Sequence, residues 1–184
     1  YPCLYKLSLL CKCANGYMYT NRVLFVTSEL TIIYLLLITI LVWSLLKLHY
    51  FASFLSGSVL YTVLSNRLGS TSILTAVQRV IDFQNQQPIT KFSFKANLYP
   101  ITIYAVLLLV ITIAIFILFE DKWQATSAIV ILAVGYAARM SVSLSPTIYA
   151  SGLRTFTPLI FSGLIVVIMI YREFIDKIGN RLFQ

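Results

Sequence analysis

The side chains best suited to chemistry gather in one short stretch, residues 139–154, between two long apolar runs. Arg139 and Arg154 bracket this stretch, and five serine and threonine side chains lie between them. Ser145-Pro146 has the order of a helix N-cap followed by Pro in the first turn, and a glycine follows where such a helix would end. The pattern therefore predicts a short helix over residues 146–151 with an arginine on either side.

That arrangement suits an anion. A helix N-terminus presents unpaired N–H groups and a partial positive charge, and a guanidinium can hold a phosphate through two parallel hydrogen bonds. In a membrane protein the available phosphates are those of lipid headgroups or lipid-linked sugars. The predicted phosphate or lipid-headgroup site consists of Arg139, Ser145, Thr147, Ser151 and Arg154. In the alternative interpretation both arginines are interfacial anchors and the turn only connects two helices.

The composition places these residues in a membrane protein. Of 184 residues, 59% are hydrophobic and only 11% are charged, against roughly 25% in an ordinary soluble domain. The mean hydropathy is +0.87. The net charge of +8 comes from basic residues spread thinly between apolar runs, so anionic headgroups are the expected partners. No basic patch with interleaved aromatics indicates a nucleic-acid partner.

The expected fold is all-α, a polytopic transmembrane helix bundle with about five spans. A spanning helix needs about 20 mostly apolar residues, and few charges interrupt the runs that meet this requirement. We predict a single membrane domain over residues 1–184. Its spans are predicted at about residues 28–47, 49–66, 100–119, 123–144 and 155–172.

The one long polar connection contains an amphipathic helix, predicted over residues 72–86. Apolar residues fall on one side at about 100° per residue, while Gln78, Arg79 and Asp82 fall on the other. Such a helix is expected to lie in the membrane interface, or else to cover other parts of the protein.

Nothing in the sequence indicates a metal, a cofactor or an acid–base pair. Three cysteines, Cys3, Cys11 and Cys13, are an odd number without a nearby histidine, and we interpret them as packing residues. The six acidic residues form no obvious catalytic pair. Whether the chain is an enzyme is left open by these residues.

Arg139, followed by Leu-Ser-Pro-Thr-Ile-Tyr-Ala-Ser-Gly-Leu-Arg-Thr-Phe at residues 144–156, resembles a segment of large bacterial membrane proteins. These proteins are uncharacterised or glucosyltransferase-like, and they are similar to the GT-C class of glycosyltransferases that use polyprenyl-phosphate-linked sugars. The segment lies near their C-terminal end, and the rest of this chain is similar only in its pattern of spans. The resemblance implies that the chain is the C-terminal part of a longer protein, as does its beginning at Tyr1. It also implies that the catalytic carboxylates lie in an early extracytoplasmic loop outside this sequence.

The expected function is therefore that of a glycosyltransferase-like protein in the bacterial plasma membrane. It would use lipid-linked sugars to modify an envelope glycan, with the lipid bilayer and a polyprenyl-phosphate-linked sugar as partners. Two alternatives stay open: a transporter or flippase component that uses the same basic loop as a headgroup gate, and an accessory or structural subunit of a membrane complex.

Overall fold

The described part of the chain is helical throughout. The computed structural model describes residues 9–27, 31–85, 94–142, 144 and 152–182, and these ranges contain helices and turns but no strand. The elements are α1 (Leu9–Asn21), the π-helical turn η2 (Arg22–Val26), α2 (Thr31–Leu46), α3 (Tyr50–Arg67), α4 (Ile73–Asn85), α5 (Phe94–Leu118), α6 (Lys122–Val142), the 3₁₀ turn η4 (Gly152–Phe156) and α7 (Thr157–Leu182). The predicted all-α class is confirmed.

Three helices of the described chain are long and apolar enough to cross a membrane. They are Asn97–Leu118, Lys122–Val142 and Leu153–Asp176. These ranges coincide with the predicted spans at 100–119, 123–144 and 155–172. Their length and composition are those expected of helices that have lipid as their solvent.

The first two predicted spans are helical, but their crossing of a membrane stays a prediction. Helix α2 has only 16 residues and meets the length requirement only when it is paired with Cys11–Val26, from which it is bent by 63°. Such a pair is either one broken span or a re-entrant loop. Helix α3 forms where the span 49–66 was expected, but it does not meet the same test, and its serines and the terminal Asn66-Arg67 lower its apolar content.

The predicted amphipathic helix is present as α4. Its apolar residues Leu74, Val77 and Ile81 are buried, and α4 packs against α3 and α5. Arg79 and Asp82 are exposed on the opposite side. This protein thus covers part of the apolar face of α4, where Ile73 is still 54% exposed. An interfacial position of α4 stays a prediction.

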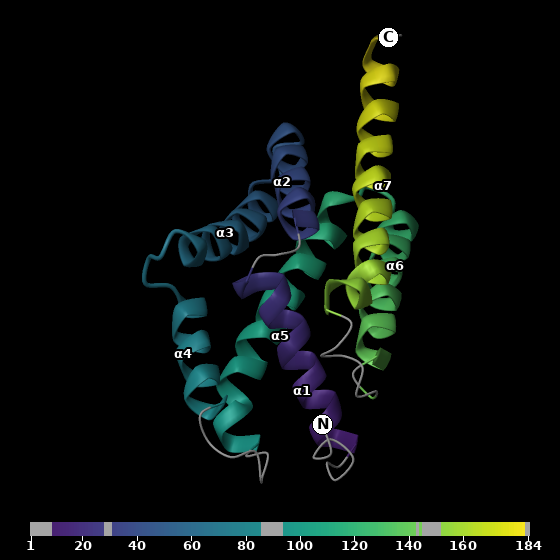
Figure 1. Ribbon diagram of the computed structural model, residues 1–184. Helices are drawn as coiled ribbons and strands as arrows, with labels where there is room; N and C mark the ends of the chain where they lie inside the picture. The colour runs from purple at the N-terminus through teal and green to yellow at the C-terminus, as the bar shows by residue number, and fades with distance from the viewer. Residues whose placement is uncertain (1–8, 28–30, 86–93, 143, 145–151, 183–184) are drawn as a thin grey trace.

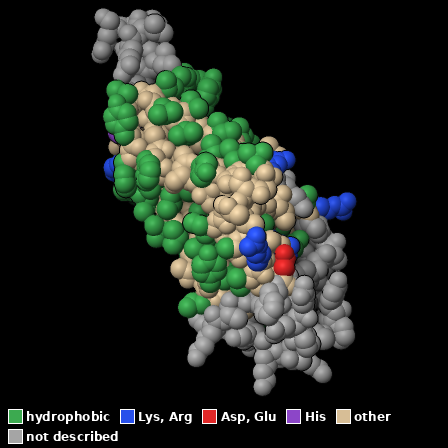
Figure 2. Space-filling model, turned by 90° about the vertical axis from the view of Figure 1, so that its left-hand side faces the viewer, with side chains coloured by type: hydrophobic (Ala, Val, Ile, Leu, Met, Phe, Trp, Pro, Cys, Tyr) green, Lys and Arg blue, Asp and Glu red, His purple; other side chains and the backbone are tan. Residues whose placement is uncertain are grey.

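Figure 1 shows how the helices are arranged. Helices α6 and α7 lie side by side, α5 runs obliquely through the middle, and α5 and α6 diverge from the short loop that joins them. The C-terminal part of α7 extends beyond the other helices. On the face shown in Figure 2, hydrophobic side chains are spread over most of the described surface, and charged side chains are few.

Helices α6 and α7 approach each other closely. A Cβ added at Gly135 of α6 would lie 2.1 Å from the Ser162 hydroxyl and 3.0 Å from the carbonyl oxygen of Pro158, both on α7. Small residues permit such contacts between membrane helices. The buried face of α6 continues this small-residue pattern through Ala125 and Ala128 and ends at Arg139.

Candidate functional site

Arg139 lies in the last turn of α6 and its side chain is completely buried. Its guanidinium carbon is 4.3 Å from the ring centroid of Phe156 in η4 and 5.4 Å from that of Tyr19 in α1. The two rings are themselves 6.3 Å apart. Three distant parts of the sequence thus meet around one cation, which gains attraction from both ring faces.

The local sequence explains why Phe156 reaches this position. Gly135 lies one turn before Arg139 on the same face of α6, and its missing side chain lets the first turns of α7 approach closely. Because η4 leads directly into α7, the same contact brings Phe156 over the arginine. Gly135 therefore positions the site without carrying any of its chemistry.

Polar side chains of α1 and α6 lie next to the arginine. The Asn21 amide donates to the Tyr136 hydroxyl at 2.8 Å and to the Tyr17 carbonyl at 2.9 Å. The Tyr17 hydroxyl donates to the carbonyl of Ile101 on α5 at 3.3 Å. Since Tyr136 precedes Arg139 by three residues, this hydrogen-bonded cluster adjoins the guanidinium along α6.

The other predicted site residues have different outcomes. Arg154 lies in η4, two residues before Phe156, and its side chain is exposed. Phe156 belongs to the same turn as Arg154, and its ring contacts the Arg139 guanidinium. The structure therefore places the turn that carries Arg154 next to Arg139. Ser145, Thr147 and Ser151 lie outside the described residues, as does the helix expected at 146–151, so their part in the site stays a prediction.

Sequence reasoning did not find Tyr19, Asn21, Tyr136 or Phe156. Tyr136 could have been predicted as a site residue, because it lies one turn before Arg139 on the same helix. The residues of α1 were harder to predict: Thr20 and Asn21 are polar, Arg22 separates them from a short apolar run, and both are buried. Phe156 belonged to the segment that supports the family resemblance, but its type alone did not indicate a contact with the arginine.

An apolar cavity of about 280 Å³ lies beside this cluster. Tyr136 lines the cavity and also accepts the hydrogen bond from Asn21, so it joins the two features. The remaining wall comes from η2, α2, α5, α6 and α7 and is almost entirely apolar.

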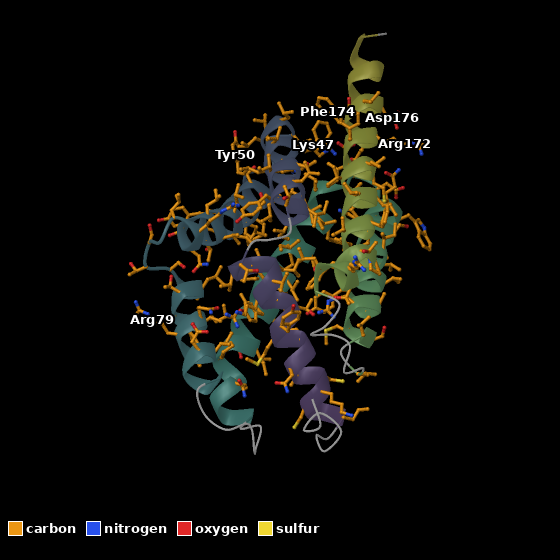
Figure 3. The ribbon with its side chains drawn as sticks, in the orientation of Figure 1. Lys47, Tyr50, Arg79, Arg172, Phe174 and Asp176 are labelled. Carbon is orange, nitrogen blue, oxygen red and sulfur yellow. The ribbon has the colours of Figure 1, made fainter. Side chains whose placement is uncertain are left out.

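A second buried cation lies near the opposite end of α6. Lys47 has a side chain only 2% exposed, and its Nζ donates to Glu173 Oε1 at 2.5 Å and to the carbonyl of Leu118 at 3.1 Å. Glu120 lies 3.5 Å away. Figure 3 shows Lys47 and Phe174 between α2 and α7, whereas Arg172 and Asp176 point away from the bundle.

Comparisons with known proteins give no family for this chain. No family model matches it, and no curated protein and no solved structure is significantly similar to it. Within the described residues, no three His, Cys, Asp or Glu side chains are placed to hold a metal ion. The site must therefore be interpreted from its own geometry.

Proposed function

We propose that this chain is the membrane-embedded part of a glycosyltransferase-like protein that binds a polyprenyl-phosphate-linked sugar in the bacterial plasma membrane. Its role is to hold the lipid carrier, and the transferred sugar goes to a glycan of the cell envelope. The chain crosses the bilayer five times in this proposal. The bent pair of α1 and α2 makes the first crossing, α3 the second, and α5, α6 and α7 the others, while α4 lies at the interface.

The observation that carries the proposal is the complete burial of Arg139 in a helix suited to span a membrane. Charged side chains within membrane-spanning segments are costly to bury, and such residues generally mark substrate or ion sites. A guanidinium is the side chain best matched to a phosphate, because its planar fork makes two parallel hydrogen bonds. In a lipid environment, the phosphate closest at hand is that of a lipid.

The neighbours of Arg139 support the same reading. The rings of Phe156 and Tyr19 both contact the guanidinium, and η4 brings the exposed Arg154 to the same end of α6. We assign the remaining phosphate contacts to Ser145, Thr147 and Ser151, whose hydroxyl groups lie between the two arginines in the sequence.

The acidic residues support a carrier-binding role for this chain. Glu120 and Glu173 are engaged with Lys47, and Asp82 is within 3.7 Å of Arg22. Asp176 is paired with Arg172 on the exposed side of α7. In the described part of the chain none of these carboxylates is paired with Arg139, and we assign to this chain only the binding of the carrier.

The proposal is tested by measuring polyprenyl monophosphate binding to the chain in nanodiscs. We expect Arg139→Gln to weaken binding by about 30-fold or more, which corresponds to about 2 kcal/mol for a lost buried charge contact. Arg139→Lys should recover only part of this loss, since an ammonium lacks the planar fork. Arg154→Gln should have a smaller effect because its side chain is exposed.

The matched control is Arg79→Gln, which removes an exposed arginine on α4 that points away from the bundle (Figure 3). Equal losses in Arg79→Gln and Arg139→Gln would mean only general attraction between basic residues and an anionic lipid, and the proposal would fail. Undetectable binding by the folded wild-type chain would favour the accessory-subunit alternative. Movement of the lipid across vesicles, without glycosyl transfer by the whole protein, would favour a flippase.

A further inference from the structure

Helix α7 has two apolar faces, and within the described residues only one of them packs against other helices. Leu159, Val166 and Ile170 are buried on the inner face, where α7 contacts α6 and α2. The opposite face carries five large hydrophobic side chains that are between 37% and 63% exposed: Phe161, Leu164, Ile168, Tyr171 and Ile175. We call this line of residues, with its continuation to Leu182, the outer seam of α7.

The residues of the outer seam recur at alternating intervals of three and four. This is the spacing of positions a and d in a heptad, which brings one line of side chains against the same line on a neighbouring helix. In the sequence, Ile178 and Leu182 continue these intervals, so the pattern covers three heptads from Phe161 to Leu182. Apolar heptads sustained over about this length are a sign of a coiled coil.

The seam continues past the part of α7 that is suited to span a membrane. That part ends at Asp176, but the helix runs without a break to Leu182, beyond the other helices (Figure 1). Five of the eleven residues from 172 to 182 are charged, yet Ile175, Ile178 and Leu182 keep the heptad spacing. Because the helix is continuous, its last turns leave the bilayer along the axis of the span. Lipid cannot cover an apolar stripe there, whereas another helix can.

The occupant that matches the seam is the α7 helix of a second copy of this chain. All copies of a membrane protein have the same orientation in the bilayer, so two α7 helices meet in parallel and each presents the same seam at the same height. The contact is then self-complementary about a two-fold axis, as in most homodimers.

The charges beside the seam are compatible with this pairing. Arg172 and Asp176 are exposed and lie 3.9 Å apart along the same helix. In a parallel pair, Arg172 at position e faces position g of the partner helix, which is Val167. Like charges therefore do not oppose one another across the seam at this level.

The exposed rings of the seam supply a substantial part of the area that a dimer needs. Phe161 and Tyr171 are about three-fifths exposed, and an aromatic side chain buries roughly 150–250 Å² when it is fully covered. Pairing would therefore bury roughly 200–300 Å² on these two residues, against about 800 Å² per partner in a stable interface. The aliphatic positions lie along the same seam, which is roughly 32 Å long.

We propose that α7 is a dimerisation helix, whose outer seam packs against the outer seam of a second copy as a short parallel coiled coil. The coiled coil begins within the bilayer and continues beyond it. This goes beyond the proposed function, because the contact involves neither Arg139 nor a lipid phosphate.

The test is a scan of single cysteines along α7, in a full-length background in which Cys3, Cys11 and Cys13 are replaced by serine. Membranes containing each variant are oxidised, and the crosslinked dimer is measured on gels. The yield should be at least about five-fold higher at the seam positions than at the positions beside them. The seam variants are Tyr171→Cys, Ile175→Cys and Ile178→Cys, and the control variants are Arg172→Cys, Asp176→Cys and Lys177→Cys.

Three results of the scan would overturn the proposal. Equal yields at all six positions would show random collision, and the absence of any dimer would leave the seam to lipid. Crosslinking of the seam positions to a different protein would mean that the partner is not a second copy.

A second measurement places a charge in the seam. Energy transfer between fluorescently labelled copies is followed in liposomes as the protein is diluted with lipid. Ile175→Lys should weaken dimerisation about 10-fold or more, because it replaces a buried apolar contact with a charge. Asp176→Lys is the matched control one residue away, and it should change dimerisation by less than about three-fold. Equal weakening in the two variants, with helix content unchanged in circular dichroism, would contradict the assignment of the seam.

Discussion

Two buried cations lie near opposite ends of α6, and their surroundings differ. Lys47 adjoins the loop that precedes α6, where Glu173 and Glu120 lie within 4 Å of its Nζ. Arg139 lies in the last turn of α6, next to the rings of Phe156 and Tyr19. Both side chains are almost fully removed from solvent, so burial alone does not distinguish them.

The difference lies in what each cation meets. The carboxylates around Lys47 come from α7 and from the α5–α6 loop, so the ion pair ties three parts of the chain together and balances its own charge. Aromatic contact is common to both cations, since Lys47 Nζ lies 5.0 Å from the ring centroid of Trp43. The site of Arg139 differs in its neighbouring amide and hydroxyl groups and in the second arginine in η4. The first arrangement is that of a structural tie, and the second is the one to which we assign a lipid phosphate.

The largest effect is expected at the structural tie. Lys47→Met leaves Glu173, whose side chain is 15% exposed, beside apolar residues without its cation, and we expect a loss of about 3 kcal/mol in unfolding free energy. Adding Glu173→Met should recover much of that loss, because removing both charges avoids the unpaired one. The measurement is denaturant unfolding of the chain in detergent micelles.

The control for this prediction is the exposed pair of Arg172 and Asp176, 3.9 Å apart on α7. Arg172→Gln should change stability by less than about 1 kcal/mol, as is usual for surface ion pairs. Folded Lys47→Met should also bind polyprenyl phosphate normally. A loss of binding as large as that of Arg139→Gln would break the distinction between the two ends.

A smaller effect is expected from the ring that covers Arg139. Phe156→Leu keeps an apolar side chain but removes the aromatic face 4.3 Å from the guanidinium. In a double-mutant cycle with Arg139→Met, the coupling energy for stability should be about 1 kcal/mol. The same cycle with Tyr19→Leu should give less, since that ring is 5.4 Å away. A coupling of zero for Phe156 would mean that the ring only fills space.

The sequence predicts the parts of this fold that depend on local pattern. Long uncharged runs predicted the helices that became α5, α6 and α7, and the 100° periodicity of residues 72–86 predicted α4. Arg139 was found because it stands at the end of an apolar run next to a segment rich in hydroxyl groups. These features can be predicted without knowing which residues pack against them.

The remaining features depend on contacts between distant residues. Lys47 was interpreted only as the end of a span, because its partner Glu173 is 126 residues away. Helix α1 was not predicted as an element of the bundle, since its mixed composition carries neither a strong apolar run nor a clear period. Its contribution to the site follows from packing against α6, which a single sequence does not record.

The smallest predicted effect concerns the hydrogen bond that joins the cavity to the polar cluster. Tyr136→Phe removes the 2.8 Å bond from Asn21, but the Asn21 amide keeps its 2.9 Å bond to the Tyr17 carbonyl. Because that second bond persists, we expect a stability loss of only about 0.6 kcal/mol, the average for such contacts between membrane helices. Affinity for long-chain polyprenyl phosphate should change little, since Arg139 and the rings next to it are unchanged.

Asn21→Leu leaves the Tyr136 hydroxyl without its donor and should cost more stability than Tyr136→Phe. The reverse order would mean that the hydroxyl has a role beyond this bond, such as a direct contact with the bound lipid, and Tyr136 would then belong with Arg139 in the binding site.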